Sequence, residues 1–206
     1  MPSPFATTAA SPAAPAVDGR HRRSERSRDS IVAAMLGLVA EGAISPSAEE
    51  VAARAGVGLR SVFRHFRDME SLFQAMQMRL AQDYQLWLVP FSTIDWRSQL
   101  AELIERRVMT YERLLPFMRA ADVHRHRSVT IYDEHLRIRA IMRARLKSVV
   151  GDAFAGDPDG LEALDLLVSP ETWQRLRLAQ NLTPAVARRV IEQQVERVLP
   201  PRPRDS

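Results

Sequence analysis

Residues 47–66 decide the fold, and they read SAEEVAARAGVGLRSVFRHF. Ser47 stands where a helix N-cap belongs, with Glu50 three residues later, which is the spacing of a capping box. The pattern predicts a short helix through Ala55, a break at Gly56-Val57-Gly58, and a second short helix to the end of the stretch. Two short helices joined by a tight glycine turn predict a helix-turn-helix, whose second helix enters the DNA major groove.

Each part of this stretch has a physical task. Gly56 can take a positive φ at the turn without a steric penalty from a Cβ atom. Five residues have the size and spacing for a small core between the two helices: Val51, Ala52, Ala55, Val57 and Val62. The second helix then presents outward Leu59, Arg60, Ser61, Phe63, Arg64 and His65. Arginine, serine and histidine on an exposed helix suit contacts to base edges and phosphates.

The flanking sequence is helical throughout. A first helix is expected from Asp29, with apolar residues on one face, ending at Gly42. Asp68, with Ser71 three residues on, opens a fourth helix that we expect to reach about Leu88. Longer helices are predicted over 96–123, 131–154, 161–179 (adjusted at Pro170) and 183–199. No segment has the pattern of a strand, so the predicted fold class is all-α.

With its flanks, the motif resembles the TetR family (tetracycline-repressor-like) of bacterial regulators. The resemblance covers residues 29–76 and rests on the Ala-Gly-Val turn, on Phe63 and Phe66, and on the Asp-x-Glu-x-Leu at residues 68–72. It implies a three-helix DNA-binding domain with the start of a fourth helix, then a helical domain that binds a small molecule and dimerises through its last two helices. The predicted DNA-binding residues are Arg28, Ser47, Gly58, Leu59, Arg60, Ser61, Phe63, Arg64 and His65.

Three positions depart from the family pattern. Phe63 stands where a tyrosine is usual, Met69 where a lysine is usual, and Gly58 where a polar residue is usual. Two phosphate contacts of the family, from the tyrosine hydroxyl and the lysine ammonium, therefore have no counterpart in this chain.

The charge is unevenly distributed. Of the 29 basic residues 28 are arginine, which either a GC-rich genome or nucleic-acid binding would explain, and the net charge is only +4. Residues 20–28 hold five arginines and one glutamate. This segment is either a flexible basic arm that follows the DNA backbone or enters the minor groove, or a solvated linker.

Several classes of protein are excluded. Without cysteine there is no disulfide, thiolate zinc site, iron–sulfur cluster or catalytic thiol, and a reducing cytoplasm is the expected location. No stretch is apolar for long enough to cross a bilayer. No nucleophile elbow, phosphate loop or HExxH motif is present, so we expect neither an enzyme nor a cofactor. His124-x-His126 has arginine neighbours that would repel a cation, so no metal is expected.

Residues beyond the motif suggest a pocket and an interface. The candidate pocket residues are Trp87, Tyr111, Phe117, His135, Met142 and Trp173, since ligand pockets are mostly apolar with a few polar groups. The candidate dimer residues are Leu164, Leu167, Val168, Val190, Ile191 and Val195, although the same side chains could pack within one chain. The arginines at 137, 139, 143 and 145 form a solvated stripe, or, if one points inward, favour an anionic effector.

We therefore expect four regions: a disordered Pro/Ala-rich tail (1–19), a basic arm with the helix-turn-helix domain (20–76), a helical ligand-binding and dimerisation domain (77–199) and a short tail (200–206). The predicted function is a homodimeric repressor that binds a palindromic operator on double-stranded DNA and is released by a small, largely apolar effector. The alternative is a regulator that answers to a partner protein or to no ligand.

Overall fold

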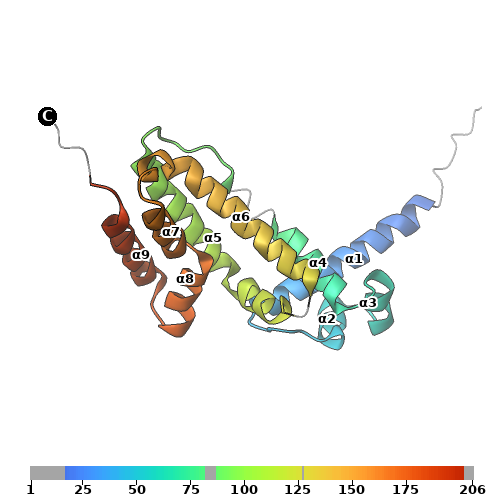
Figure 1. The fold of residues 1–206 in the computed structure, drawn as a ribbon. Coiled ribbons are helices and arrows are strands. Elements are labelled where there is room, and N and C mark those ends of the chain that lie inside the picture. Colours follow the sequence, from blue (N-terminus) through green and yellow to red (C-terminus); the bar gives the residue numbers. More distant parts are fainter. Residues whose placement is uncertain (1–16, 82–86, 127, 202–206) are drawn as a thin grey trace, which may run out of the picture.

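The computed structural model describes residues 17–81, 87–126 and 128–201, and every regular element in these ranges is a helix (Figure 1). Four helices form the N-terminal end: α1 (Val17–Ala40), α2 (Ala48–Ala55), α3 (Leu59–His65) and α4 (Met69–Leu80). Two long helices follow, α5 (Trp96–His124) and α6 (Val129–Val150). The C-terminal end holds α7 (Pro158–Leu167), α8 (Pro170–Gln174), a π-helical turn (Arg175–Ala179) and α9 (Pro184–Val198). The predicted all-α class is confirmed.

The helix boundaries follow the signals in the sequence. The capping box is present, since the Ser47 hydroxyl accepts from the Glu50 N–H at 3.2 Å and Glu50 Oε2 accepts from the Ser47 N–H at 2.7 Å. Asp68 and Ser71 make the equivalent pair at the start of α4. Gly56 ends α2 at φ 66°, a conformation that glycine adopts without strain. These local bonds fix the two short helices of the motif at the expected places.

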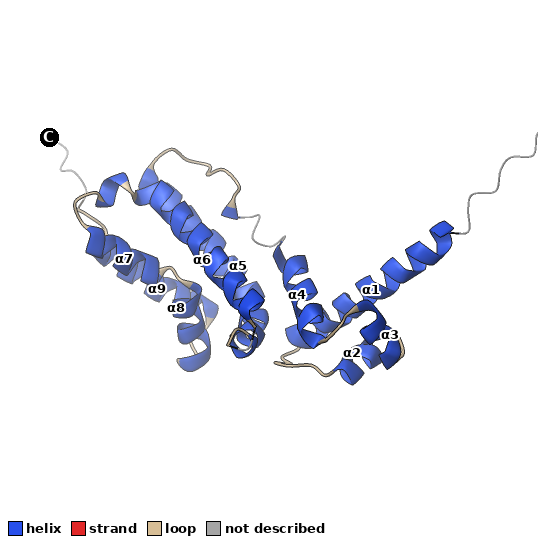
Figure 2. Cartoon of the chain, turned by 45° about the vertical axis from the view of Figure 1, so that its right-hand side comes forward, coloured by secondary structure: helices blue, strands red, loops and turns tan. Residues whose placement is uncertain are grey.

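Helix α1 begins much earlier than expected. We expected the first helix to begin at Asp29 and residues 20–28 to be either a flexible arm or a solvated linker, but this segment is part of α1, which starts at Val17 and projects beyond the other helices (Figures 1 and 2). The C-terminal half of α1 is anchored in the core, and arginine is a good helix former, so each further residue extends an existing helix rather than nucleating a new one. The predicted tail boundary at residue 19 is therefore wrong by at least three residues; residues 1–16 lie outside the described ranges.

Three other expected helices end sooner than predicted. Helix α4 ends at Leu80, Leu88 lies in a turn, and residues 82–86 lie outside the described part. The helix expected to reach Phe154 stops at Val150 and gives way to a 3-10 turn. The helix expected over 161–179 is divided because Ser169 caps a new helix with Pro170 in its first turn.

Two hydrophobic cores hold the chain together. One is built from α5 to α9 around Trp173, Leu146 and Leu164. The other lies between α1 and α4, and it includes Ala120 from the end of α5 and Ile131 from the start of α6. The tip of the α5–α6 hairpin is thus part of the core of the N-terminal end, which joins the two parts through packed side chains.

Candidate nucleic-acid interface and effector pocket

Helix α3 presents four of its predicted contact residues on the surface, whereas Ser61 and His65 are partly buried. Arg60 and Arg64 are exposed, as are Phe63 at 49% and Leu59 at 38%, while Val62 on the opposite side is buried. The Gly58 carbonyl accepts from the Ser61 N–H at 2.8 Å, which starts the helix. Exposed phenylalanine and leucine beside two arginines form a surface that can meet both the thymine methyl group and polar groups of DNA.

The arginines of the motif divide into two kinds. Arg54 bonds to Glu41 at the end of α1, with Nη1 to Oε2 at 2.8 Å, and Arg67 lies 2.9 Å from Asp68. In contrast, no carboxylate among the described residues lies within 4 Å of Arg60 or Arg64. The unpaired guanidiniums on α3 are free to bind an anion, since each carries five donors that suit phosphate or guanine.

Arg28 connects α1 to the end of α3. Its guanidinium lies 4.9 Å from the centre of the Phe66 ring, which is buried. Next to it, burial lowers the pKa of His65, and the charges of Arg64 and Arg28 lower it further. His65 is therefore neutral near pH 7, and its buried Nε2 has no hydrogen-bond partner among the described residues. The interface thus carries its positive charge on arginine rather than on histidine.

The basic segment before Arg28 is a helix that extends away from the other helices (Figure 2). Arg22, Arg23 and Arg26 are exposed on it, and Arg26 Nε donates to the Arg22 carbonyl at 3.2 Å. Because these three residues are spaced by one, three and four positions, they lie on one side of the helix. The segment is a rigid projection with a basic face rather than a flexible arm.

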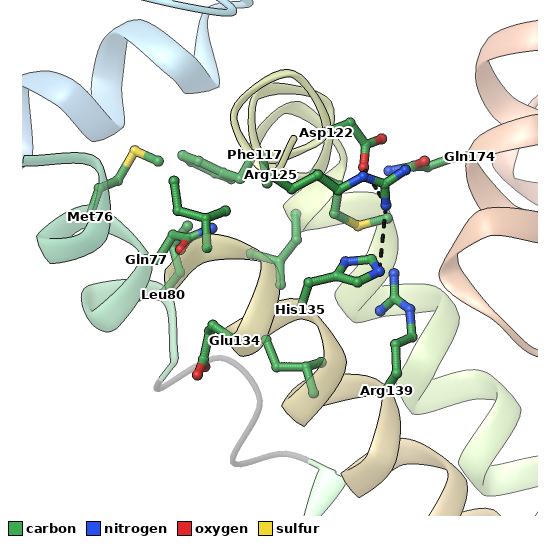
Figure 3. Close-up of a pocket in the computed structure, with 15 residues that line it drawn as sticks. Met76, Gln77, Leu80, Phe117, Asp122, Arg125, Glu134, His135, Arg139 and Gln174 are labelled. Carbon is green, nitrogen blue, oxygen red and sulfur yellow. Dashed lines mark hydrogen bonds and ion pairs between the residues drawn. The ribbon is translucent and has the colours of Figure 1, made fainter. Parts of the chain in front are cut away.

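A pocket lies between α4, α5, α6 and α8, with a cavity of about 70 Å³ (Figure 3). Phe117 and His135, both predicted to line a pocket, do line this one. Helix α4 contributes Met76, Gln77 and Leu80. The helix that directly follows the helix-turn-helix thus forms one wall of the pocket.

The other predicted pocket residues belong to the core. Tyr111 is buried and donates to the Val168 carbonyl at 3.0 Å; its burial raises the pKa of the hydroxyl. Trp173 is 0% exposed and donates to Glu112 at 3.1 Å. Trp87 and Met142 border a separate, smaller cavity of about 20 Å³. We correct the prediction for Tyr111 and Trp173, because their polar atoms have partners within the chain.

The predicted dimer residues also pack within the chain. Leu164, Val168, Ile191 and Val195 are at most 3% exposed, and Leu167 and Val190 pack against the same core. The periodicity that suggested an interface is that of an amphipathic helix facing its own core. Leu166 on α7, 65% exposed, is a surface residue that the sequence pattern did not indicate.

A contact between the two ends of the molecule was missed by the sequence analysis. Ser128, buried at the start of α6, donates to Glu70 of α4 at 2.5 Å and also accepts from the Ile131 N–H. Beside it, the rings of Phe73 and His124 lie 4.6 Å apart. The N-cap position of Ser128 was readable from the sequence, but its partner 58 residues away was not.

Two kinds of feature are absent from the described residues. No helix there is both long and apolar enough to span a bilayer. No group of three potential metal ligands is present in the same ranges.

Comparison with known proteins finds a similarity at the N-terminal end. A family model described as bacterial regulatory proteins, tetR family, matches residues 31–76. The fold resembles the crystal structure of a transcriptional regulator from Rhodococcus sp. Rha1, with a TM-score of 0.65, 20% identity, and coverage of 84% of this chain and 95% of that one. No curated protein matches the sequence. The match of residues 31–76 includes α2, α3 and most of α4.

Proposed function

We propose that this chain, a TetR family regulator by its N-terminal domain, is a homodimeric repressor that binds a palindromic operator and is released by a small molecule. The observation that carries the proposal is the pair of unpartnered arginines, Arg60 and Arg64, on the exposed face of α3. Arg28 lies beside the end of the same helix. Such a surface can place guanidiniums on base edges while the neighbouring positive charge meets phosphates.

Dimerisation is proposed because one α3 covers too little DNA for tight and specific binding. Two recognition helices one helical turn of DNA apart, about 34–36 Å, would match two half-sites related by a two-fold axis. The outer faces of α7 and α9 are the proposed contact, with exposed Leu166 and partly buried Val190 in place of the fully buried residues of these helices.

The position of the pocket supports a ligand response. Met76, Gln77 and Leu80 line it from α4, and the same helix buries Leu72 and Phe73 in the core of the DNA-binding end. An apolar cavity of about 150 Å³ is known to admit benzene, so the 70 Å³ cavity is too small for most organic molecules as it stands. A larger ligand would have to shift α4, and with it α3. It would therefore favour a conformation with differently spaced recognition helices.

A gel-shift experiment tests the proposed function. The purified full-length protein is mixed with DNA from upstream of its own gene, with excess unrelated DNA as competitor. We expect a complex that survives the competitor and weakens as salt rises, because phosphate contacts release counterions. Footprinting of the complex should protect two half-sites about 10 base pairs apart or a multiple of this. If only complexes that the competitor removes are seen, with this DNA and with a library of genomic fragments, the proposed function is wrong.

A further inference from the structure

We propose, on the basis of the ligand-responsive function above, that the effector is an amphipathic organic acid. Its carboxylate would bind between Arg125, His135 and Arg139. Its apolar part would face Met76, Leu80 and Phe117.

The pocket has two chemically different sides (Figure 3). Asp122 of α5 and Arg125, directly after this helix, meet His135 and Arg139 of α6 on one side, where Gln174 also lies. The other side is formed by α4 and by apolar residues of α5 and α6: Met76, Leu80, Leu114, Phe117 and Ile131. A molecule that fills both sides needs one charged or strongly polar end and one apolar end.

Hydrogen bonding on the polar side favours an acceptor. Arg125 Nη1 lies 3.3 Å from Asp122 Oδ1 and 3.4 Å from His135 Nε2, which accepts because a guanidinium can only donate. The Nε atom of Arg125 is buried and has no hydrogen-bond partner among the described residues. A buried donor without an acceptor is unfavourable, so an oxygen atom placed there would be stabilised.

Arginines have a larger effect on His135 than carboxylates do. Burial lowers the pKa of His135, and the charges of Arg139 and Arg125 lower it further, against smaller opposite effects of Glu171 and Asp122. The two arginines thus outweigh the two carboxylates at the position of the imidazole. An anion is favoured there, and a cation is not.

A basic ligand fits the pocket less well. The carboxylates near the polar side already have cationic partners: Asp122 pairs with Arg125, Glu134 with Arg137, and Glu171 with Arg139. An ammonium group would have to compete with a guanidinium for each of them. By contrast, a carboxylate gains the free donor on Arg125 without breaking a pair.

Calorimetry with matched compounds tests the class of ligand. The purified protein is titrated with straight-chain acids of four to ten carbons, benzoate and phenylacetate, and with the primary amide and the amine of each. We expect at least one acid to bind roughly ten-fold to a hundred-fold more tightly than its amide, which corresponds to a charged hydrogen bond. The proposal is wrong if no acid binds better than its amide, or if the amines bind more tightly than the acids.

Variants locate the binding site. Arg125→Gln and Arg139→Gln should remove the preference for the acid over its amide. Both variants should keep a helical circular-dichroism spectrum and a cooperative thermal transition, which shows that they fold. The matched control is Arg119→Gln, which changes an exposed arginine of α5 outside the pocket lining and should have no effect. An unchanged preference in both pocket variants would overturn the assignment.

The pH dependence gives an independent readout. The charged groups that act on His135 are Asp122 on α5, Arg125 directly after α5, Arg139 on its own helix, and Glu171 on α8. A bound carboxylate counteracts the two arginines and raises the pKa of His135, so binding takes up a proton. The affinity for the acid should rise from pH 8 to pH 6, by at most about ten-fold per unit for one proton, and His135→Gln should abolish the rise. An unchanged slope in this variant would exclude His135 from the site.

Release of DNA separates this proposal from the proposed function. If an acid binds but leaves the DNA complex intact, the assigned chemistry stands and the ligand response is wrong. If only neutral or basic compounds release the DNA, the ligand response stands and the assigned chemistry is wrong.

Discussion

The arginines at the two ends of the molecule differ in what they contact. Among the described residues of α1 and α3, no carboxylate lies within 4 Å of Arg23, Arg28, Arg60 or Arg64. In the part formed by α5 to α9, arginines join one helix to another through carboxylates: Arg139 to Glu171, Arg143 to Glu162 and Asp165, Arg177 to Glu112, and Arg188 to Glu105. Arginine thus forms an exposed basic surface on α1 and α3, and forms ion pairs between helices in the part built from α5 to α9.

This difference explains why composition was ambiguous. A count of 28 arginines and one lysine is the same whether the guanidiniums are paired or free. Surface ion pairs contribute little to stability, so the paired arginines mainly fix helix positions. The unpaired arginines keep their N–H donors for another molecule. Because they lie on α3 and α1, we expect that molecule to be DNA.

The largest expected effect on DNA binding comes from removing the free guanidiniums of α3. Each of Arg60→Ala and Arg64→Ala should weaken operator binding by about 1–3 kcal/mol if the side chain contacts a base. The double variant should bind roughly a hundred-fold more weakly. Arg119→Ala, also exposed but on α5, is the control. Fluorescence anisotropy with the operator measures the affinity of each variant. Equal losses of affinity in the α3 variants and in the control would contradict the difference between the two ends of the molecule.

The next effect concerns α7. Leu164 is 0% exposed, so Leu164→Ala should destabilise the folded chain by about 2–5 kcal/mol, because it leaves a cavity in the core. Leu166→Ala, at an exposed position of the same helix, should leave unfolding of the monomer unchanged and weaken dimerisation. Urea unfolding and analytical ultracentrifugation separate the two outcomes. A stable Leu164→Ala monomer would contradict the core assignment.

A smaller effect is expected from the basic projection of α1. Replacing Arg22, Arg23 and Arg26 with glutamine should weaken binding to any DNA sequence by a similar factor. If all three contact phosphates, the slope of log K against log salt should fall by about three. Ser24→Pro, which breaks the helix but keeps the charge, tests whether the rigid geometry matters. A triple variant with an unaltered slope would mark the segment as a solvated extension.

The smallest effect is predicted at the contact between the ends. Glu70→Ala removes the acceptor of the Ser128 hydroxyl and should cost about 0.5–1.5 kcal/mol of stability. It should also loosen α4 from α6, so that more ligand is needed to release DNA. Glu70→Gln, which keeps an acceptor oxygen, should behave like the natural protein. If Glu70→Ala has the same stability and ligand response as the natural protein, the hydrogen bond does not couple the two ends.

Local signals made the N-terminal half of the fold predictable. The capping box at Ser47, the glycine at position 56 and the N-cap at Asp68 each act within a few residues, and each was confirmed. The same local reasoning placed helix starts close to Trp96 and Pro184. It failed for residues 20–28, where anchoring of α1 in the core decides that the helix continues toward the N-terminus.

The pocket was predictable only in part, since it joins residues far apart in the sequence. His135 was predicted because it places a polar atom on an otherwise apolar helical face, and Phe117 because it is one of the large aromatic residues that could line a cavity. Tyr111 and Trp173 have the same appearance in sequence, but their polar atoms meet Val168 and Glu112, about sixty positions away. No periodicity shows which of two aromatic residues faces a cavity and which faces another helix.

The sequence by itself determined the all-α class, the helix-turn-helix and the outward residues of α3, because capping, turn geometry and amphipathic spacing are local. Only the tertiary structure decided which arginines are free, which apolar faces are internal, and how α4 connects the pocket to α3. These features depend on distances between residues that are remote along the chain and on which side chains are buried. An amphipathic helix has the same sequence pattern whether its apolar face packs against its own core or against a partner.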